Sequence, residues 1–88
     1  MGKYEKLLSR ILRGGSDKNI EFDDLRRLLK RLGFEERIRG SHHIFRKSGM
    51  IEKVNLQRNG NKAKAYQVRQ VRKVIIDYNL GDELDEQV

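Results

Sequence analysis

Apolar residues recur every three or four positions in three parts of the chain, and this spacing predicts three amphipathic helices. The first is expected over residues 4–12, the second over 22–33 and the third over about 65–79. One stripe of each helix should face the core. The stripes are Tyr4, Leu7, Leu8, Ile11 and Leu12, then Leu25, Leu28, Leu29 and Leu32, and finally Val68, Val71, Val74, Ile75 and Tyr78.

Glycines and charged residues indicate where these helices begin and end. Asp23 and Asp24 fall in the first turn of the second helix, where acidic side chains favour the helix dipole. Gly33 follows its last leucine, and Gly81 follows the third helix. Because glycine readily adopts left-handed backbone angles, both positions are expected to end a helix.

The pattern changes to short extended runs between the second and third helices. Strands are expected over residues 34–39, 41–47 and 50–57, and an Asn59-Gly60 turn signal follows the last of them. Three consecutive strands joined by short turns favour an antiparallel meander that one layer of helix can cover. The predicted fold is therefore α+β, with helices on one face of a three-stranded antiparallel sheet and the order α-α-β-β-β-α.

The net charge of the chain indicates what kind of partner it binds. The chain holds 20 Lys and Arg against 13 Asp and Glu, a net charge of +7. Four of the acids lie within residues 82–88, so residues 1–80 carry 20 minus 9, or +11. A small domain this basic is typical of proteins that bind a polyanion, nucleic acid first. We expect a single domain over residues 1–81, followed by a disordered acidic tail over 82–88.

Several classes of protein are excluded by what the sequence lacks. There is no cysteine, so neither a disulfide nor a thiolate metal site can form. No apolar run approaches the roughly 18 residues of a membrane span, and the N-terminus lacks the apolar core of a signal peptide. We expect a cytoplasmic protein that needs no membrane and no cofactor.

The two histidines of the chain are adjacent, in the segment expected to form the second strand. Successive strand residues point to opposite faces of a sheet, so His42 and His43 diverge. His43 shares a face with Phe45, and His42 shares the other with Ile44. Because Ile44 and Phe45 are both apolar, the pattern does not decide which face is the core.

Three interpretations of the pair compete. Metal binding is disfavoured because adjacent strand histidines do not converge on one ion. An ordinary pair, one half-buried and one at the surface, is preferred from the pattern alone. A catalytic role needs an exposed histidine among cations that can bind phosphate. The candidate cations are Arg37, Arg39, Arg46, Lys47 and Lys53 in the strands and Arg72 in the third helix.

The catalytic interpretation fits the chemistry of RNA. A ribose 2′-hydroxyl can attack its own phosphodiester when a base removes its proton, and no metal is required. An imidazole has an ordinary pKa near 6.5, and such acid–base help is typically worth about 10²–10⁴ in rate. Lysine and arginine side chains can hold the phosphate and stabilise its developing charge.

The run "GSHHIF" at residues 40–45 resembles a motif of the HicA toxin family. The likeness extends over residues 22–47, "FDDLRRLLKRLGFEERIRGSHHIFRK". This stretch has a leucine-striped helix, a Leu-Gly-Phe exit, a charged strand and a Gly-Ser-His start to the next strand. With the basic helix after the Asn-Gly turn, the resemblance covers about residues 22–80.

This resemblance implies both a fold and an activity. HicA proteins are small toxins with a fold like that of the double-stranded-RNA-binding domain, and they cleave mRNA without a metal through the histidine of the Gly-Ser-His motif. A partner antitoxin, HicB, covers their active face. The motif histidine corresponds to His42, which is therefore expected to act as general base or acid, with Gly40 and Ser41 forming the start of its strand.

The sequence departs from the family at two places. Many members carry a proline and a second histidine at the end of the third strand, where this chain has Asn55, Leu56 and Gln57. Gln57 cannot transfer protons, which leaves a scheme with one histidine, in which water or a lysine protonates the leaving oxygen. The helix over residues 4–12 precedes the usual start of the family. It could extend the antitoxin interface, pack on the core or mediate self-association into a homo-oligomer.

Three functions follow from these observations. The preferred hypothesis is the toxin of a type II toxin–antitoxin system, an endoribonuclease that cleaves mRNA and binds a HicB-type antitoxin. The alternative is a non-catalytic RNA- or DNA-binding module with a basic sheet face, whose affinity would fall steeply with salt. A third is a protein-interaction domain whose basic surface binds an acidic partner.

Overall fold

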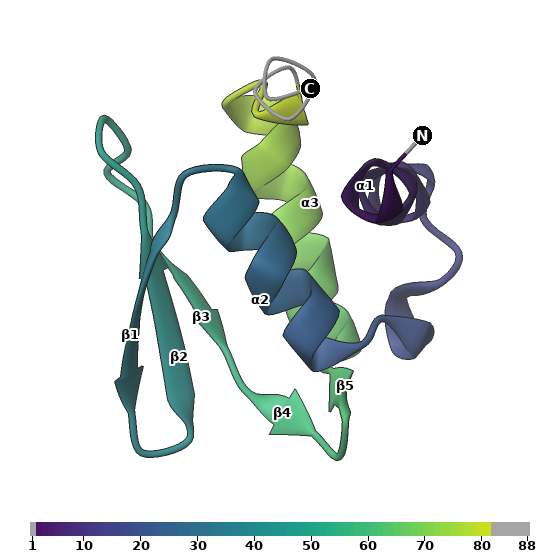
Figure 1. Cartoon of the computed structure of the whole chain (residues 1–88), viewed down its shortest axis with the longest axis horizontal. Coiled ribbons are helices and arrows are strands. Elements are labelled where there is room, and N and C mark those ends of the chain that lie inside the picture. Colours follow the sequence, from purple (N-terminus) through teal and green to yellow (C-terminus); the bar gives the residue numbers. More distant parts are fainter. Residues whose placement is uncertain (1, 82–88) are drawn as a thin grey trace.

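The structure is a computed structural model that describes residues 2–81. It confirms the α+β class and the order α-α-β-β-β-α, and adds a short 3₁₀ helix and a small hairpin (Figure 1). The elements are α1 (Lys3–Arg13), η1 (Asp17–Asn19), α2 (Phe22–Arg31), β1 (Glu35–Arg39), β2 (His42–Arg46), β3 (Val54–Leu56), β4 (Arg58–Asn59), β5 (Lys62–Ala63) and α3 (Ala65–Asp77). The tail predicted over residues 82–88 lies outside the described residues.

Strands β1, β2 and β3 form the predicted antiparallel meander, in that order across the sheet. Arg39 lies opposite His42 in the β1–β2 pair, and Ile44 lies opposite both Arg37 on β1 and Asn55 on β3. The Asn-Gly turn joins β4 to β5, which pair only with each other among the named strands. The register therefore places polar and charged residues of all three strands side by side on one face.

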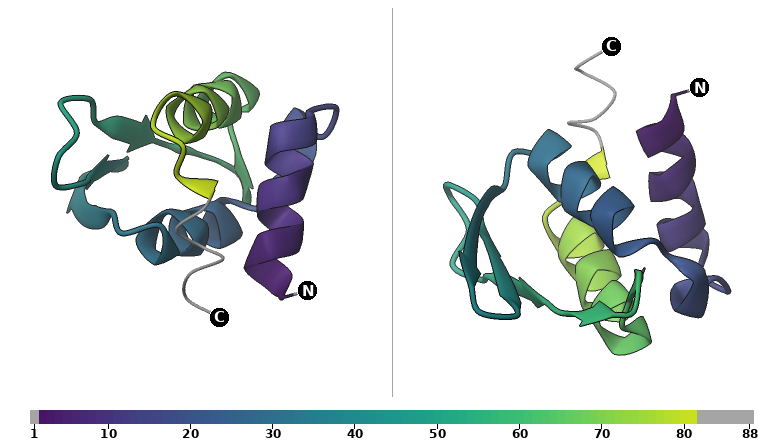
Figure 2. Two further views of the ribbon diagram at one scale, coloured as in Figure 1. Left: turned by 90° about the horizontal axis from the view of Figure 1, so that it is seen from above. Right: turned by 60° about the horizontal axis from the view of Figure 1, so that its bottom comes forward.

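The helices lie on the other face of this sheet and form two further layers. Helices α2 and α3 pack side by side against the sheet, and α1 lies beyond them (Figures 1 and 2). This arrangement is compatible with the double-stranded-RNA-binding-domain-like fold implied by the resemblance. Within residues 2–81 no helix covers the outer face of the sheet. No helix in this part of the chain is long and apolar enough to cross a membrane.

The core is built mainly from the predicted stripes. The four predicted leucines, three in α2 and Leu32 at its C-cap, are fully buried. They belong to one core cluster with Phe45 on β2 and Leu56 on β3, which are also fully buried. Val68, Val71, Val74 and Ile75 bring α3 into the same cluster. Leu12 and Tyr78, which were predicted to be core residues, are instead 40% and 37% exposed.

Helix α1 joins the same core. Leu7, Leu8 and Ile11 are buried among residues of the other elements, and Ile11 is fully inaccessible. The ring of Tyr4 lies under the guanidinium carbon of Arg31, 4.8 Å from its centroid. Of the three roles left open for this helix, the structure shows packing on the core.

Helices α2 and α3 end in the same way, with different residues. After α2, Gly33 takes a positive φ of 97°, and the amides of Gly33 and Phe34 donate to the carbonyls of Lys30 and Leu29. The prediction that Gly33 ends this helix is confirmed.

The end of α3 differs from the prediction, because the helix stops at Asp77 and Asn79 supplies the positive φ, 53°, in place of Gly81. The amide of Leu80 then donates to Ile75, and the Leu80 side chain is buried. Asparagine tolerates this conformation because its short polar side chain suits left-handed backbone angles.

Candidate active site

His42 lies on the open face of the sheet. It is the first residue of β2 and is exposed, whereas His43 and Phe45 point to the helices and are buried. Strand alternation thus separates the two imidazoles, as predicted, and core packing decides which one is inside. The two rings point to opposite faces and cannot bind one ion together.

Two side chains at the end of β3 contact the His42 imidazole. Its Nδ1 lies 3.2 Å from Oδ1 of Asn55, and its Nε2 lies 3.3 Å from Nε2 of Gln57. Gln57 also contacts Ser41 Oγ at 3.4 Å, and Lys64 Nζ donates to Gln57 Oε1 at 3.1 Å. The ring is therefore held on both nitrogens while it stays open to solvent.

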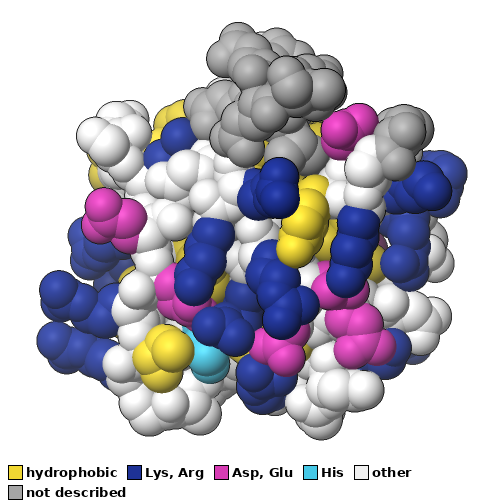
Figure 3. Space-filling model, in the orientation of Figure 1, with side chains coloured by type: hydrophobic (Ala, Val, Ile, Leu, Met, Phe, Trp, Pro, Cys, Tyr) yellow, Lys and Arg dark blue, Asp and Glu magenta, His cyan; other side chains and the backbone are white. Residues whose placement is uncertain are grey.

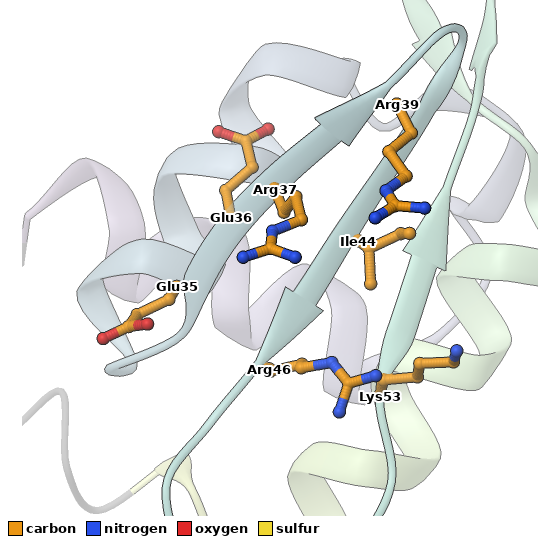
Figure 4. A pocket seen from close by; sticks show the side chains of 7 residues that line it. All are labelled: Glu35, Glu36, Arg37, Arg39, Ile44, Arg46 and Lys53. Atoms are coloured by element: carbon orange, nitrogen blue, oxygen red, sulfur yellow. The ribbon is translucent and has the colours of Figure 1, made fainter.

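A basic groove lies beside this histidine. It has a volume of about 460 Å³, with Ile44 in the middle and cationic side chains around it (Figure 4). The four cations are Arg37, Arg39, Arg46 and Lys53. Because Arg39 is the cross-strand partner of His42, the imidazole stands at the edge of this group. Glu36 points away from it, toward the helices (Figure 4).

The other two predicted phosphate-binding residues lie elsewhere. Lys47 lines an adjoining hollow, which shares Glu35 and Arg46 with the groove and extends along the loop between β2 and β3. Arg72 donates to the backbone carbonyl of Ile11 at 2.6 Å and pairs with Asp17, so it fastens α1 and η1 to α3. The structure brings together four of the six predicted cations and places Arg72 on the side of the molecule that carries α1.

Cations are not confined to the sheet. Lysine and arginine side chains also cover much of the helical surface, interspersed with acidic ones, and several project from the edge where the sheet lies (Figure 3). Several helical cations are paired, as Lys73 is with Asp77 at 2.5 Å. On the open face of the sheet, four cations line one groove together with Glu35 and Glu36.

The side chain of His43 is packed in the protein interior, where it contacts a carboxylate and an aromatic ring. Its Nδ1 donates to Glu36 Oε2 at 2.8 Å, and its ring meets Phe22 edge-on with centroids 4.9 Å apart. Arg58 lies over the same Phe22 ring, at 4.5 Å. The ordinary interpretation of a packed strand histidine therefore fits His43, while His42 has the exposure that the catalytic interpretation requires.

Glu36, the acidic partner of this histidine, was not predicted from the sequence. The Glu36 side chain is only 4% exposed, and Arg26 binds it with two nitrogens, at 2.6 and 2.9 Å. Lys30 contributes a third cationic contact at 2.9 Å. Hydrogen bonds from Arg26 hold the pKa of the Glu36 carboxyl far below its usual range, with help from His43 and Lys30 and against the effect of burial.

A signal for this cluster was present in the sequence. Glu36 lies between Phe34 and Ile38 in the alternation of β1, on the side that faces the helices. A carboxylate placed there needs cations, and Arg26 and Lys30 are four residues apart on one side of α2.

Comparison with known families agrees with this geometry. The family model described as the HicA toxin of bacterial toxin–antitoxin systems matches residues 22–75, well over half of the chain. The chain therefore belongs to the HicA toxin family. Membership implies a toxin of a toxin–antitoxin system with an antitoxin as partner. No curated protein and no solved structure gave a match.

The matched region contains the candidate site. It begins at the first residue of α2 and includes the sheet and most of α3. His42, Asn55, Gln57 and Lys64 all lie within it. Helix α1 lies outside the match, although it belongs to the same core.

Proposed function

We propose that this toxin is a metal-independent endoribonuclease that cleaves mRNA in the cytoplasm, with His42 as its general base. The observation that carries the proposal is the exposed imidazole of His42 at the edge of a groove ringed by four cations. An RNA strand crossing the open sheet face would meet both. The family to which the chain belongs supports the same assignment.

The groove supplies the binding step. Arg37, Arg39, Arg46 and Lys53 can neutralise consecutive phosphates, and guanidinium groups bind phosphate through paired N–H donors. Ile44 gives an apolar surface between them, against which a base or ribose can rest. These contacts are made to the backbone, so they hold the strand without selecting its sequence.

His42 supplies the chemical step. Its imidazole takes the proton of a ribose 2′-hydroxyl, and the resulting oxygen attacks the adjacent phosphorus. The bond to the 5′-oxygen of the next nucleotide breaks, and water or a lysine protonates that oxygen. The products are a 2′,3′-cyclic phosphate and a 5′-hydroxyl end. Nearby guanidinium groups stabilise the charge that builds on the phosphate during attack.

The antitoxin would act by covering this face. A HicB-type partner that places acidic side chains over the groove would compete with RNA for the same cations.

The deciding experiment uses labelled mRNA incubated with the purified protein in EDTA. We expect fragments that end in cyclic phosphate, and a loss of cleavage of at least about 10²-fold in His42→Ala. His42 is exposed, so the variant should keep its circular dichroism spectrum and its RNA affinity. Cleavage that survives the substitution, or that disappears in EDTA, would overturn the proposal.

The second candidate is a module that binds RNA without cleaving it. The groove favours this function too, since its cations would bind phosphate whatever His42 does. The same experiment separates the two. A binding module would retain intact RNA, and its affinity would be unchanged by His42→Ala.

A further inference from the structure

We propose that Gln57 is a positioning residue that holds the imidazole of His42 in the tautomer with its proton on Nδ1 and a free electron pair on Nε2. The catalytic consequence rests on the proposed function. The tautomer itself can be measured without RNA, so the two ideas can fail separately.

The orientation of the Gln57 amide follows from Lys64. An ammonium group has three N–H donors and no acceptor, so the atom that faces Lys64 Nζ at 3.1 Å must be the amide oxygen. The amide nitrogen of Gln57 then faces His42 Nε2 at 3.3 Å. Because an amide nitrogen only donates, His42 Nε2 must accept.

The second ring nitrogen completes the assignment. A neutral imidazole carries one proton, and with Nε2 as acceptor that proton is on Nδ1. The Nδ1 atom lies 3.2 Å from Asn55 Oδ1, which can accept it. From Lys64 through Gln57 and His42 to Asn55, every donor meets an acceptor.

Helix α3 fixes the position of this chain of hydrogen bonds. The backbone amide of Gln57 donates to the side-chain oxygen of Gln67 at 2.9 Å, and Gln67 is 3% exposed. Lys64 is the N-cap residue of α3, whose first turn carries no acidic residue. The helix dipole disfavours a cation at this end, so helix stability does not explain this lysine.

The tautomer matters because Nε2 is the nitrogen that would meet the substrate. The contact of 3.3 Å is longer than a typical hydrogen bond, so a ribose 2′-hydroxyl can replace the Gln57 amide as donor to Nε2. The proton then moves from the 2′-oxygen to Nε2. The imidazolium formed keeps its Nδ1–H on Asn55, which stabilises the new charge.

Two substitutions test the tautomer assignment, one beside each ring nitrogen of His42. Each replaces a neutral amide by a carboxylate, so both add the same charge. In Gln57→Glu the atom facing Nε2 becomes an acceptor, so the neutral imidazole should carry its proton on Nε2. In Asn55→Asp an acceptor remains an acceptor, so the proton should stay on Nδ1. The measurement is nitrogen-15 NMR of histidine-labelled protein at about pH 8.5, two units above the ordinary imidazole pKa. The His42→Ala spectrum identifies the signals of His42.

A third variant tests the anchor. Lys64→Met frees the Gln57 amide to rotate, so His42 should become a mixture of tautomers, while folding stability should not fall because a cation leaves the helix N-terminus. A proton on Nε2 in the unsubstituted protein, or the same tautomer in Gln57→Glu and Asn55→Asp, would overturn the inference.

Cleavage assays then connect the tautomer to function. We expect Gln57→Glu to cleave RNA at least about 10²-fold more slowly than Asn55→Asp, because only the former blocks the accepting nitrogen. Expected tautomers without any cleavage by the unsubstituted protein would overturn the proposed function and leave the assignment intact. If the unsubstituted protein cleaved RNA while His42 carried its proton on Nε2, the tautomer assignment would be overturned and the proposed function would stand.

Discussion

Neighbouring histidines in one strand have entirely different surroundings. His43 donates a hydrogen bond from Nδ1 to a buried carboxylate and packs on Phe22, whereas His42 faces two amides in solvent. Alternation along the strand is enough to produce this difference, because it places one ring among ionised and aromatic core groups and the other beside the basic groove.

The ionised carboxylate of Glu36 should make folding stability depend on pH. The pKa of Glu36 is lowered on folding, so its charge stabilises the folded protein above the ordinary carboxyl pKa, 4.5, and this contribution is lost as pH falls toward the folded-state value. Glu36→Gln should cost about 3 kcal/mol at pH 7, since it leaves Arg26 and Lys30 without their shared partner. The difference from the unsubstituted protein should shrink below about pH 4.5.

Urea unfolding at a series of pH values measures this difference. Glu35→Gln is the matched control, because Glu35 is the exposed neighbour on the same strand and should change stability by no more than about 0.5 kcal/mol. Equal costs for Glu35→Gln and Glu36→Gln, or a cost for Glu36→Gln that grows at acid pH, would contradict the assignment.

Residue roles could be predicted only in part. The sequence indicated that His42 and His43 diverge, but Ile44 and Phe45 suit either face, so the core had to decide. The approach of Gln57 to His42 depends on the cross-strand register of β2 and β3, which no spacing in the sequence specifies. Lys64 was missed, although a lysine at a helix start, where acids are favoured, was a usable signal.

Helices with an apolar stripe over several turns were predicted well. Strands were predicted less well, because a strand depends on a neighbouring strand for its hydrogen bonds. The leucine stripe predicted for the second helix is buried at all four positions, three of them in α2 and the fourth at its C-cap. The third strand was expected over residues 50–57 but begins at Val54, opposite Phe45 near the end of β2. Residues before it lack a strand to pair with, because β2 ends at Arg46. A strand exists only where a neighbour supplies its hydrogen bonds.

At the scale of elements, we predict that helix α1 contributes to the folding stability of the domain. It lies outside the matched family region, yet Ile11 is fully buried against the rest of the core. Ile11→Ala should lower the free energy of unfolding by about 2–5 kcal/mol, whereas Leu12→Ala, one position away and exposed, should change it by no more than about 0.5 kcal/mol. Chemical denaturation compares the two. Equal effects would mean that α1 is not part of the cooperative core.

At the scale of the whole molecule, the layering determines where a partner can bind. All three helices lie to one side of the sheet, so the described chain leaves the other side uncovered (Figure 2). The net charge predicted a polyanionic partner but not its location, since cations occur on the helices as well. The fold supplies the location by bringing Arg37 of β1, Arg46 of β2 and Lys53, the residue before β3, around one groove.

The final prediction separates this groove from general positive charge. Binding of single-stranded RNA should weaken with salt, with a slope of about −0.7 per phosphate contacted. Replacing Arg37 and Lys53 by Gln should reduce the slope by about 1.4, because two of these contacts are lost. The control replaces Lys6 and Arg13 of α1 by Gln, which removes the same charge from exposed positions on the helix that lies beyond α2 and α3 and should leave the slope unchanged. The assays use a His42→Ala background, so that the RNA stays intact. If both double variants reduced the slope equally, RNA would be held by net charge over the whole surface, and the groove beside His42 would not be its binding site.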